Sequence, residues 1–201
     1  MEEQEYFQTL TQEDKASVIL YRAGIVLSTL FVLAGACFSS NATRYEEYIS
    51  FAFLTDVLLI LLYAAVGMSV FFIHLYVGKF HRALKTLYYV AVISLVLLFV
   101  IGRGDTSGAL MSKIYGPLLL LPLAGCLGFI TAKEAFCFRL IEGYLLALIM
   151  PLYLVMLAAR GLTASGVSYG LILIAAMLVV FTLRKVFMPL HYDIGDKSAY
   201  T

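Results

Sequence analysis

The sequence predicts an all-α fold: a polytopic membrane helix bundle with six transmembrane helices. Hydrophobic residues make up 62% of the 201 residues, and the mean hydropathy is +0.94, whereas a soluble domain is about half apolar. The chain also contains six apolar stretches close to the length of about 20 residues that a helix needs to cross roughly 30 Å of hydrocarbon. No repeat, low-complexity tract or linker interrupts them, so we expect a single integral membrane domain over residues 1–201.

The first helix is expected to begin at Thr11–Asp14, which has the spacing of a capping box before an apolar run. Polar residues 39–50 separate the first two spans, and the basic segment Gly78–Arg82 separates the second from the third. Residues 103–108 have the composition of a turn and precede the fourth span. The six predicted spans cover residues 17–38, 51–77, 84–102, 112–132, 141–159 and 167–188.

Prolines occur inside two of these predicted spans. Pro117 and Pro122 belong to the fourth span, and Pro151 belongs to the fifth. A proline in a helix interior removes a backbone donor and kinks the helix, which membrane helices tolerate when neighbours satisfy the freed carbonyl. We therefore expect kinked helices at these positions, with a role in packing.

The distribution of basic residues predicts the orientation of the bundle. With six spans, both termini lie on one side of the membrane, and that side carries ten Lys and Arg residues against four on the other. The positive-inside rule then places both termini on the cytoplasmic side, or on the stromal side in a plastid. The ten residues are Lys15, Arg22, Lys79, Arg82, Lys85, Lys133, Arg139, Arg184, Lys185 and Lys197.

This topology gathers scattered polar residues at the inner membrane boundary. Ionisable groups near hydrocarbon are costly unless they pair or reach the interface, so they are candidates for function. Long basic side chains at span ends more often extend to the interface and anchor the helix, which is the favoured interpretation for Arg22. The candidates of this inner-face polar cluster are Arg22, His74, His81, Lys133, Glu134, Cys137 and Glu142.

His74 and Glu134 are the most informative members of this set. His74 lies in apolar sequence seven residues before His81, so the two share a face if the helix continues that far. A contact between His74 and Glu134 would be a structural tie, a proton relay or a pair of metal ligands, with Cys137 as a third ligand. The spacing matches no metal-site pattern, so we predict no metal site. A lone histidine in a span can also ligate chlorophyll or another tetrapyrrole, which makes His74 the candidate cofactor residue, although the sequence requires no cofactor.

Asp56 lies near the outer end of the second predicted span. An acidic group inside the membrane can bind a proton or a cation in a transporter. Thr55 and Asp56 precede a long apolar run, however, so helix capping or an interfacial position is favoured.

The chain shows no nucleophile elbow, phosphate loop, dinucleotide-binding glycine motif or HExxH sequence. We therefore predict no catalytic residue, and the sequence favours a role other than an enzyme. The net charge of +1 gives no reason to expect a nucleic-acid partner.

Three segments of the chain together resemble a known family. They are Leu10–Lys15 with Tyr21–Gly24, Ile73–Val77 with Phe80–Lys85, and Lys133–Arg139. In these segments the chain resembles the domain-of-unknown-function 2301 family, integral membrane proteins typical of cyanobacteria and plastid-bearing lineages. The resemblance covers most of the chain, and the segment Lys-Glu-Ala-Phe-Cys-Phe is its most specific part. It implies a thylakoid or another plastid or cyanobacterial membrane, and it brings no activity with it.

The sequence thus leaves three functional hypotheses, and all of them place the chain in a lipid bilayer. The favoured one is a structural, assembly or accessory component of a larger, photosynthetic membrane complex, because catalytic motifs are absent and the loops are short. The second is a small-molecule or ion transporter with Asp56 and the region of His74 and Glu134 on its path. The third is a membrane-embedded enzyme, or a pigment- or metal-binding protein, that uses the inner-face His, Glu and Cys residues.

Overall fold

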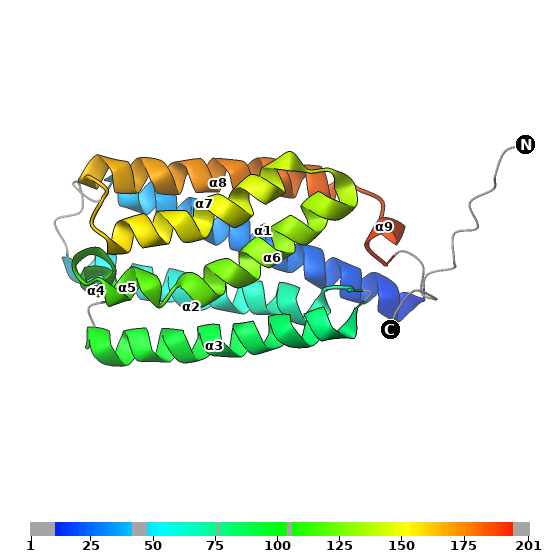
Figure 1. The fold of residues 1–201 in the computed structure, drawn as a ribbon, viewed down its shortest axis with the longest axis horizontal. Helices are drawn as coiled ribbons and strands as arrows, with labels where there is room; N and C mark the ends of the chain where they lie inside the picture. The colour runs from blue at the N-terminus through cyan, green and yellow to red at the C-terminus, as the bar shows by residue number, and fades with distance from the viewer. Residues whose placement is uncertain (1–10, 42–47, 76, 104–105, 195–201) are drawn as a thin grey trace, which may run out of the picture.

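The structure is a computed structural model that describes residues 11–41, 48–75, 77–103 and 106–194. These residues form nine α-helices and no β-strand (Figure 1). The helices are α1 (Gln12–Asn41), α2 (Tyr48–Phe72), α3 (Gly78–Gly102), α4 (Thr106–Ser112), α5 (Tyr115–Leu118), α6 (Leu121–Phe138), α7 (Ile141–Ala158), α8 (Ala164–Val186) and α9 (His191–Ile194).

Within the described residues, six helices are long and apolar enough to cross a membrane, namely α1, α2, α3, α6, α7 and α8. They run side by side along the long axis of the molecule, with α4 and α5 at one end and α9 at the other (Figure 1). We call the end where α1 begins and α8 ends the terminal end, and the end that carries α4 and α5 the distal end. The predicted fold class of an all-α bundle with six spans is confirmed. The side of the membrane that each end faces stays a prediction.

The N-terminal capping box is present as predicted. The backbone N–H of Thr11 donates to Asp14 Oδ2 at 2.9 Å, and the N–H of Asp14 donates to Thr11 Oγ1 at 3.2 Å. Two of the N–H groups that a helix start leaves without a partner are thereby satisfied. The helix that begins here has 30 residues, which corresponds to about 45 Å at 1.5 Å per residue. It is therefore longer than a membrane crossing requires.

The predicted boundary between the second and third spans is wrong. The helix α2 ends at Phe72, and α3 begins directly after the extended residue Val77. His74 therefore lies in a non-helical connection, whereas His81 lies in the first turns of α3, so the two are not on one helix. Apolarity does not mark this break, because Ile73 and Val77 are as apolar as a span interior. Their β-branched side chains do favour an extended backbone.

The fourth span, predicted over 112–132 as one kinked helix, is also wrong in its first half. The chain instead forms the short helices α4 and α5 before α6 begins at Leu121, so the segment predicted as a turn becomes helical from Thr106. Pro117 lies in α5, and Pro122 lies at the start of α6, where the missing N–H has no helical partner to lose. Of the three prolines, only Pro151 lies inside a long helix as predicted.

Close helix packing depends on Gly24 at the crossing of α1 and α2. A Cβ atom added to Gly24 would lie 2.7 Å from the carbonyl oxygen of Ala65. This distance is too short for any side chain, so the approach of the two backbones requires glycine. Small residues at such positions are typical of membrane helix interfaces.

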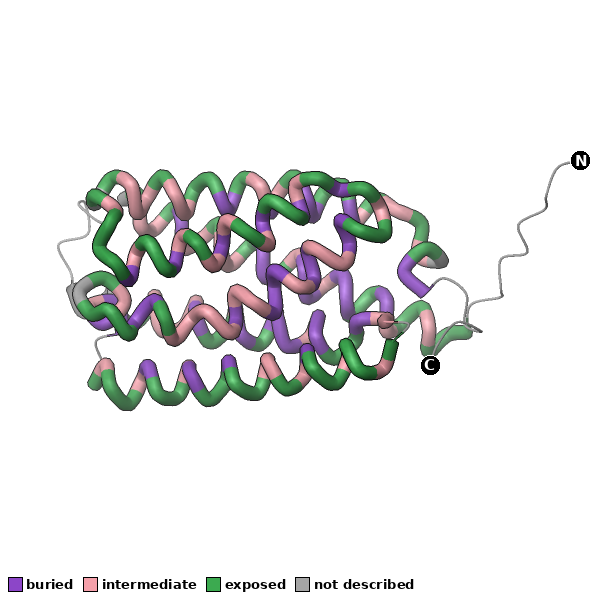
Figure 2. Tube along the Cα trace, viewed as in Figure 1, coloured by how far each residue is buried: buried purple, intermediate pink, exposed green. Residues whose placement is uncertain are grey.

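The surface of the bundle is rich in large apolar side chains, as expected for helices that face lipid. Along α3, which lies at the edge of the bundle, Ile93 is 59% exposed and Val100 is 68% exposed. A soluble protein rarely exposes such a continuous apolar surface. Figure 2 shows that the buried stretches are densest toward the terminal end of the bundle, where the charged residues described next are found.

Candidate functional site

A group of buried charged side chains lies at the terminal end of the bundle. Their exposed fractions range from 0% for Lys185 and Glu134 to 13% for Lys133. Burying a charge is costly unless it is paired and hydrogen-bonded, so these contacts determine what the site can do. We call these charged residues, together with the tyrosine that binds them, the ion-pair cluster; it consists of Tyr21 and Arg22 of α1, Lys133 and Glu134 of α6, Lys185 of α8 and Asp193 of α9.

Glu134 is the centre of the cluster. Its Oε1 atom accepts hydrogen bonds from the Tyr21 hydroxyl at 2.6 Å and from Lys133 Nζ at 2.7 Å. Its Oε2 atom lies 2.5 Å from Lys185 Nζ in an ion pair. Both carboxylate oxygens are thus occupied by groups from three helices, α1, α6 and α8.

Asp193 continues the network into the C-terminal segment. Its Oδ1 atom pairs with Lys185 Nζ, so that this one ammonium group bridges both carboxylates of the cluster. Its Oδ2 atom accepts a hydrogen bond from Arg22 Nε at 2.6 Å. The short helix α9 is therefore held against α1 and α8 by a carboxylate that is 1% exposed.

Arg22 also binds the backbone between α8 and α9. Its guanidinium donates to the carbonyl oxygens of Val186 at 3.1 Å, Met188 at 2.5 Å and Pro189 at 3.0 Å. The last carbonyls of a helix lack intrahelical partners, and a cation there is favoured by the helix dipole. The favoured interpretation of Arg22 as an anchor at the interface is therefore wrong, because its side chain is buried and caps the end of α8.

Two aromatic rings lie near the lysines of the cluster. The cluster has an excess of positive charge, because it contains three cations and two carboxylates. Lys185 Nζ lies 4.0 Å from the centre of the Phe138 ring, and Lys133 Nζ lies 5.7 Å from the centre of the Tyr21 ring. Cations at such distances are attracted by the negative face of an aromatic ring. These rings therefore help to stabilise the positive charge that the carboxylates leave unbalanced.

A tight turn positions Glu134 next to this network. The helix α6 ends at Phe138, and Arg139 adopts a left-handed conformation with φ 54°, from which its N–H donates to the carbonyl of Ala135. The helix α7 then begins at Ile141, so that α6 and α7 lie side by side. In the last two turns of α6, Glu134 is therefore on the face that packs inside the bundle, whereas Phe136 and Cys137 are exposed.

The structure shows no hydrogen bond between His74 and Glu134 among the described residues, a contact that the sequence had left open. The Nε2 atom of His74 instead lies 3.3 Å from Ser17 Oγ, within hydrogen-bond distance. Its Nδ1 atom is buried and has no hydrogen-bond partner among the described residues. Burial, and then the positive charge of Lys133, lower the pKa of His74 below its ordinary value, so the neutral imidazole is favoured. Of the two ring nitrogens, Nδ1 is thus closed to a ligand, and Nε2 is within hydrogen-bond distance of Ser17.

The remaining predicted residues lie outside the cluster. Glu142 accepts two hydrogen bonds from Arg184 Nη1, at 2.7 and 2.8 Å, and this pair is partly exposed. Cys137 is exposed, and His81 lies on α3. In the part of the chain that the structure describes, no group of three or more His, Cys, Asp or Glu residues is placed to hold a metal ion. Asp56 lies inside α2, eight residues after the helix begins at Tyr48, so the predicted capping role is wrong. It belongs to the half of α2 that begins at the distal end (Figure 1).

Sequence reasoning missed Tyr21, Lys185 and Asp193 as members of the site. The signal for Lys185 was its position inside the last predicted span, two residues after the apolar run that ends at Leu183, where we counted it only as a basic residue at the interface. No local pattern marks Asp193, because its partner Arg22 is 171 positions away in the sequence.

A comparison with protein families identifies the chain. Residues 68–201 match a family model described as an uncharacterized integral membrane protein. The chain belongs to the DUF2301 family. Neither a curated protein nor a solved structure matches it. The DUF2301 match includes Lys133, Glu134, Lys185 and Asp193, whereas Tyr21 and Arg22 precede it, so four of the six cluster residues lie in the matched region. It confirms the resemblance noted in the sequence and the assignment as an integral membrane protein.

The geometry of this DUF2301 protein limits the chemistry of the cluster. Three of the four carboxylate oxygens of Glu134 and Asp193 accept hydrogen bonds from the same chain, and the fourth, Glu134 Oε2, is held only by its ion pair with Lys185 Nζ. The cluster therefore joins three membrane helices to the C-terminal segment. A substrate, a metal ion or a transported proton would have to displace one of these internal partners.

Proposed function

We propose that this protein is a structural, assembly or accessory component of a larger membrane complex, in which the ion-pair cluster holds the terminal end of the bundle in one conformation. The observation that carries the proposal is the closed network around Glu134 and Asp193, whose side chains are 0% and 1% exposed. Separating a buried ion pair leaves an uncompensated charge, which costs about 3–5 kcal/mol. Such a network supports a fixed surface rather than a site that changes partners during turnover.

The membrane we propose is a thylakoid or another plastid or cyanobacterial membrane, with both termini on the cytoplasmic or stromal side. The support for the membrane is the resemblance of three segments to a family typical of photosynthetic lineages. The support for the orientation is the excess of Lys and Arg on the terminal side of the predicted spans, ten against four. The partners we propose are therefore photosynthetic membrane subunits or their assembly factors.

The test is isolation of the protein from its native membrane in a mild detergent. The tag belongs at the N-terminus, because Asp193 near the C-terminus takes part in the cluster. An unrelated polytopic membrane protein with the same tag serves as the control, and the bound proteins are quantified by mass spectrometry. We expect one or more photosynthetic subunits in stoichiometric amounts. Recovery of the protein alone or as a homo-oligomer contradicts the proposal, and transport assays on Asp56→Asn and Glu134→Gln variants would then follow.

A further inference from the structure

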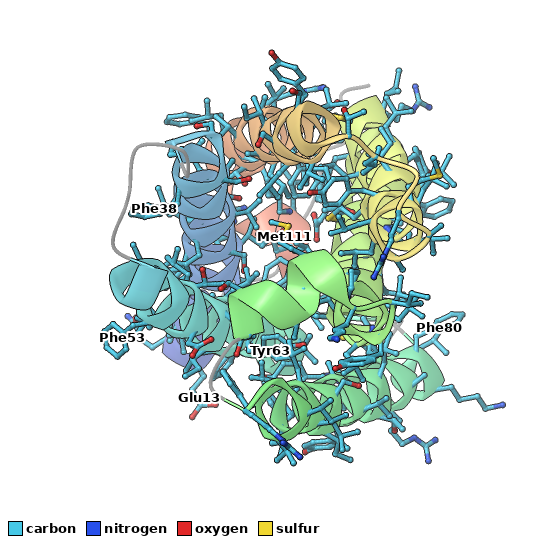
Figure 3. All side chains as sticks on the ribbon, turned by 90° about the vertical axis from the view of Figure 1, so that its left-hand side faces the viewer. Glu13, Phe38, Phe53, Tyr63, Phe80 and Met111 are labelled. Atoms are coloured by element: carbon cyan, nitrogen blue, oxygen red, sulfur yellow. The ribbon has the colours of Figure 1, made fainter. Side chains whose placement is uncertain are left out.

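A second feature, separate from the ion-pair cluster, is a cavity in the distal half of the bundle. Its volume is about 220 Å³, and residues of α1, α2, α4, α7 and α8 contribute to its walls. Figure 3 looks into the bundle from the distal end and shows Met111 of α4 near the middle of a ring of helices, with Phe38 of α1 at its edge. Both residues line the cavity.

The walls of this cavity are almost entirely apolar, and several of their polar groups are already bonded. The Tyr153 hydroxyl donates to the carbonyl of Val167 at 3.0 Å, and Ser39 Oγ is 3.2 Å from Ser168 Oγ. A buried water molecule needs about two to four polar partners, and apolar cavities of about 150 Å³ stay dry and bind benzene. This larger cavity therefore suits a hydrocarbon and not water.

The shape of the cavity favours a chain over a compact ring. On α1 the lining residues extend from Phe31 to Ser39, and on α2 they extend from Leu54 to Leu62. Each stretch corresponds to about 12 Å of helix at 1.5 Å per residue. The lining thus follows α1 and α2 from the distal end toward the middle of the bundle. Lipid chains run in this same direction from the membrane surface toward its centre.

We propose that this cavity binds an acyl chain of a membrane lipid, with the lipid headgroup at the distal end of the bundle. Hydrocarbon is the solvent that surrounds the helices, so acyl chains are available at high concentration. A void without atoms on one side forfeits dispersion contacts along its walls, and a chain that enters the cavity restores them. This binding site is independent of the ion-pair cluster and of the proposed accessory function.

Gly35 provides a way to fill the cavity without disturbing the fold. It lines the cavity on α1, and a Cβ atom added there would meet no other atom within 4 Å. A leucine at this position would occupy space that the acyl chain needs. The matched control is Gly35→Ala, which makes the same improvement in helix propensity and adds only one methyl group.

The first experiment measures the lipid retained by the purified full-length protein after exchange into detergent, by native mass spectrometry. We expect a bound phospholipid on the wild type and on Gly35→Ala, and its loss from Gly35→Leu. Equal retention by the two variants, or a wild-type protein without lipid, would overturn the proposal.

The second experiment uses the wild type and does not depend on the folding of a variant. The protein is reconstituted with phospholipids that carry a photoreactive diazirine on the acyl chain, and the labelled positions are identified by mass spectrometry. Leu59 and Leu154 line the cavity and are only 9% exposed, so label at these residues requires a chain inside it. Label confined to outward residues such as Ile93 and Val100 overturns the proposal.

Discussion

The C-terminal segment provides the most direct perturbation of the ion-pair cluster. Asp193 pairs with both Arg22 and Lys185, and its carboxylate is 1% exposed. The substitution Asp193→Asn preserves the shape of the side chain but removes its charge. Three buried cations would then face Glu134 alone.

The expected loss of stability follows from the burial of this pair. Removing one partner of a buried ion pair costs about 3–5 kcal/mol, because the remaining charge is left uncompensated. For a chain of this length, each kcal/mol shifts the melting temperature by about 2–4 °C. We therefore expect Asp193→Asn to melt roughly 6–20 °C below the wild type in thermal unfolding of the detergent-solubilised protein.

Two further variants separate the charge effect from other causes. Glu142→Gln breaks the partly exposed pair with Arg184, whose side chain is 51% exposed, and is expected to cost about 0–1 kcal/mol. Adding Lys185→Met to Asp193→Asn restores the original charge balance and should recover part of the loss, because matched removal of both partners is far less costly. If Asp193→Asn melts like the Glu142→Gln control, the C-terminal segment is not held by the cluster, and the reasoning is refuted.

Three other predictions concern separate parts of the molecule. Gly24→Leu should destabilise the protein by about 1–3 kcal/mol or more, whereas Gly35→Ala should not. The melting temperatures of the two variants check this, because a side chain at position 24 would meet the backbone of α2, whereas one at position 35 has free space around it. Stability should fall on acidification, because the folded-state pKa of His74 lies below its ordinary value of 6.5. The unfolded chain then takes up the proton first, so the contribution of His74 to stability is complete above pH 6.5 and is lost as the pH falls through the folded-state pKa. Melting curves of the wild type and His74→Gln from pH 5 to 7.5 check this prediction. Equal pH dependence of the two melting temperatures contradicts it. In a Cys37→Ser variant, which removes the other exposed thiol, Cys137 at the terminal end should react with a membrane-impermeant maleimide only from the cytoplasmic or stromal side, and labelling from the opposite side would reverse the predicted orientation.

The membrane architecture was predictable from the sequence because it depends on length and apolarity. Each of the six predicted spans corresponds at least in part to a helix that can cross a membrane. The start of α1 was predictable as well, because the capping box depends only on Thr11 and Asp14, three residues apart. Patterns of this kind are local, so one sequence is sufficient to recognise them.

The errors occurred where apolarity does not determine the backbone. The end of α2 at Phe72 falls within an apolar run, and the non-helical residues 73–75 and the extended residue Val77 separate it from α3. The prolines of the fourth predicted span were recognised, but Pro117 and Pro122 separate short helices from α6 instead of kinking one helix. A proline thus indicates a disruption without telling whether the helix bends or restarts.

The candidate site was predictable only in part, because its pairs join distant parts of the chain. Arg22, Lys133 and Glu134 were identified because placing an ionisable group near hydrocarbon costs free energy. Their partners were not, because the contact between Arg22 and Asp193 spans 171 positions and that between Tyr21 and Glu134 spans 113. Without the fold, His74 was as reasonable a partner for Glu134 as the lysines that surround it.

The central claim is that the ion-pair cluster is a structural tie, and Glu134→Gln tests it most directly. The measurement is the amount of folded protein in the native membrane for the wild type, Glu134→Gln and Glu134→Gln with Lys133→Met. Lys133 Nζ lies 2.7 Å from Glu134 Oε1, so the second substitution removes the cation that the first leaves unpaired. We predict that Glu134→Gln lowers the amount of protein and that Lys133→Met restores much of it. Normal accumulation of Glu134→Gln together with a growth defect would contradict this account, because it would mean that the Glu134 carboxylate acts in chemistry or transport and not in holding the fold.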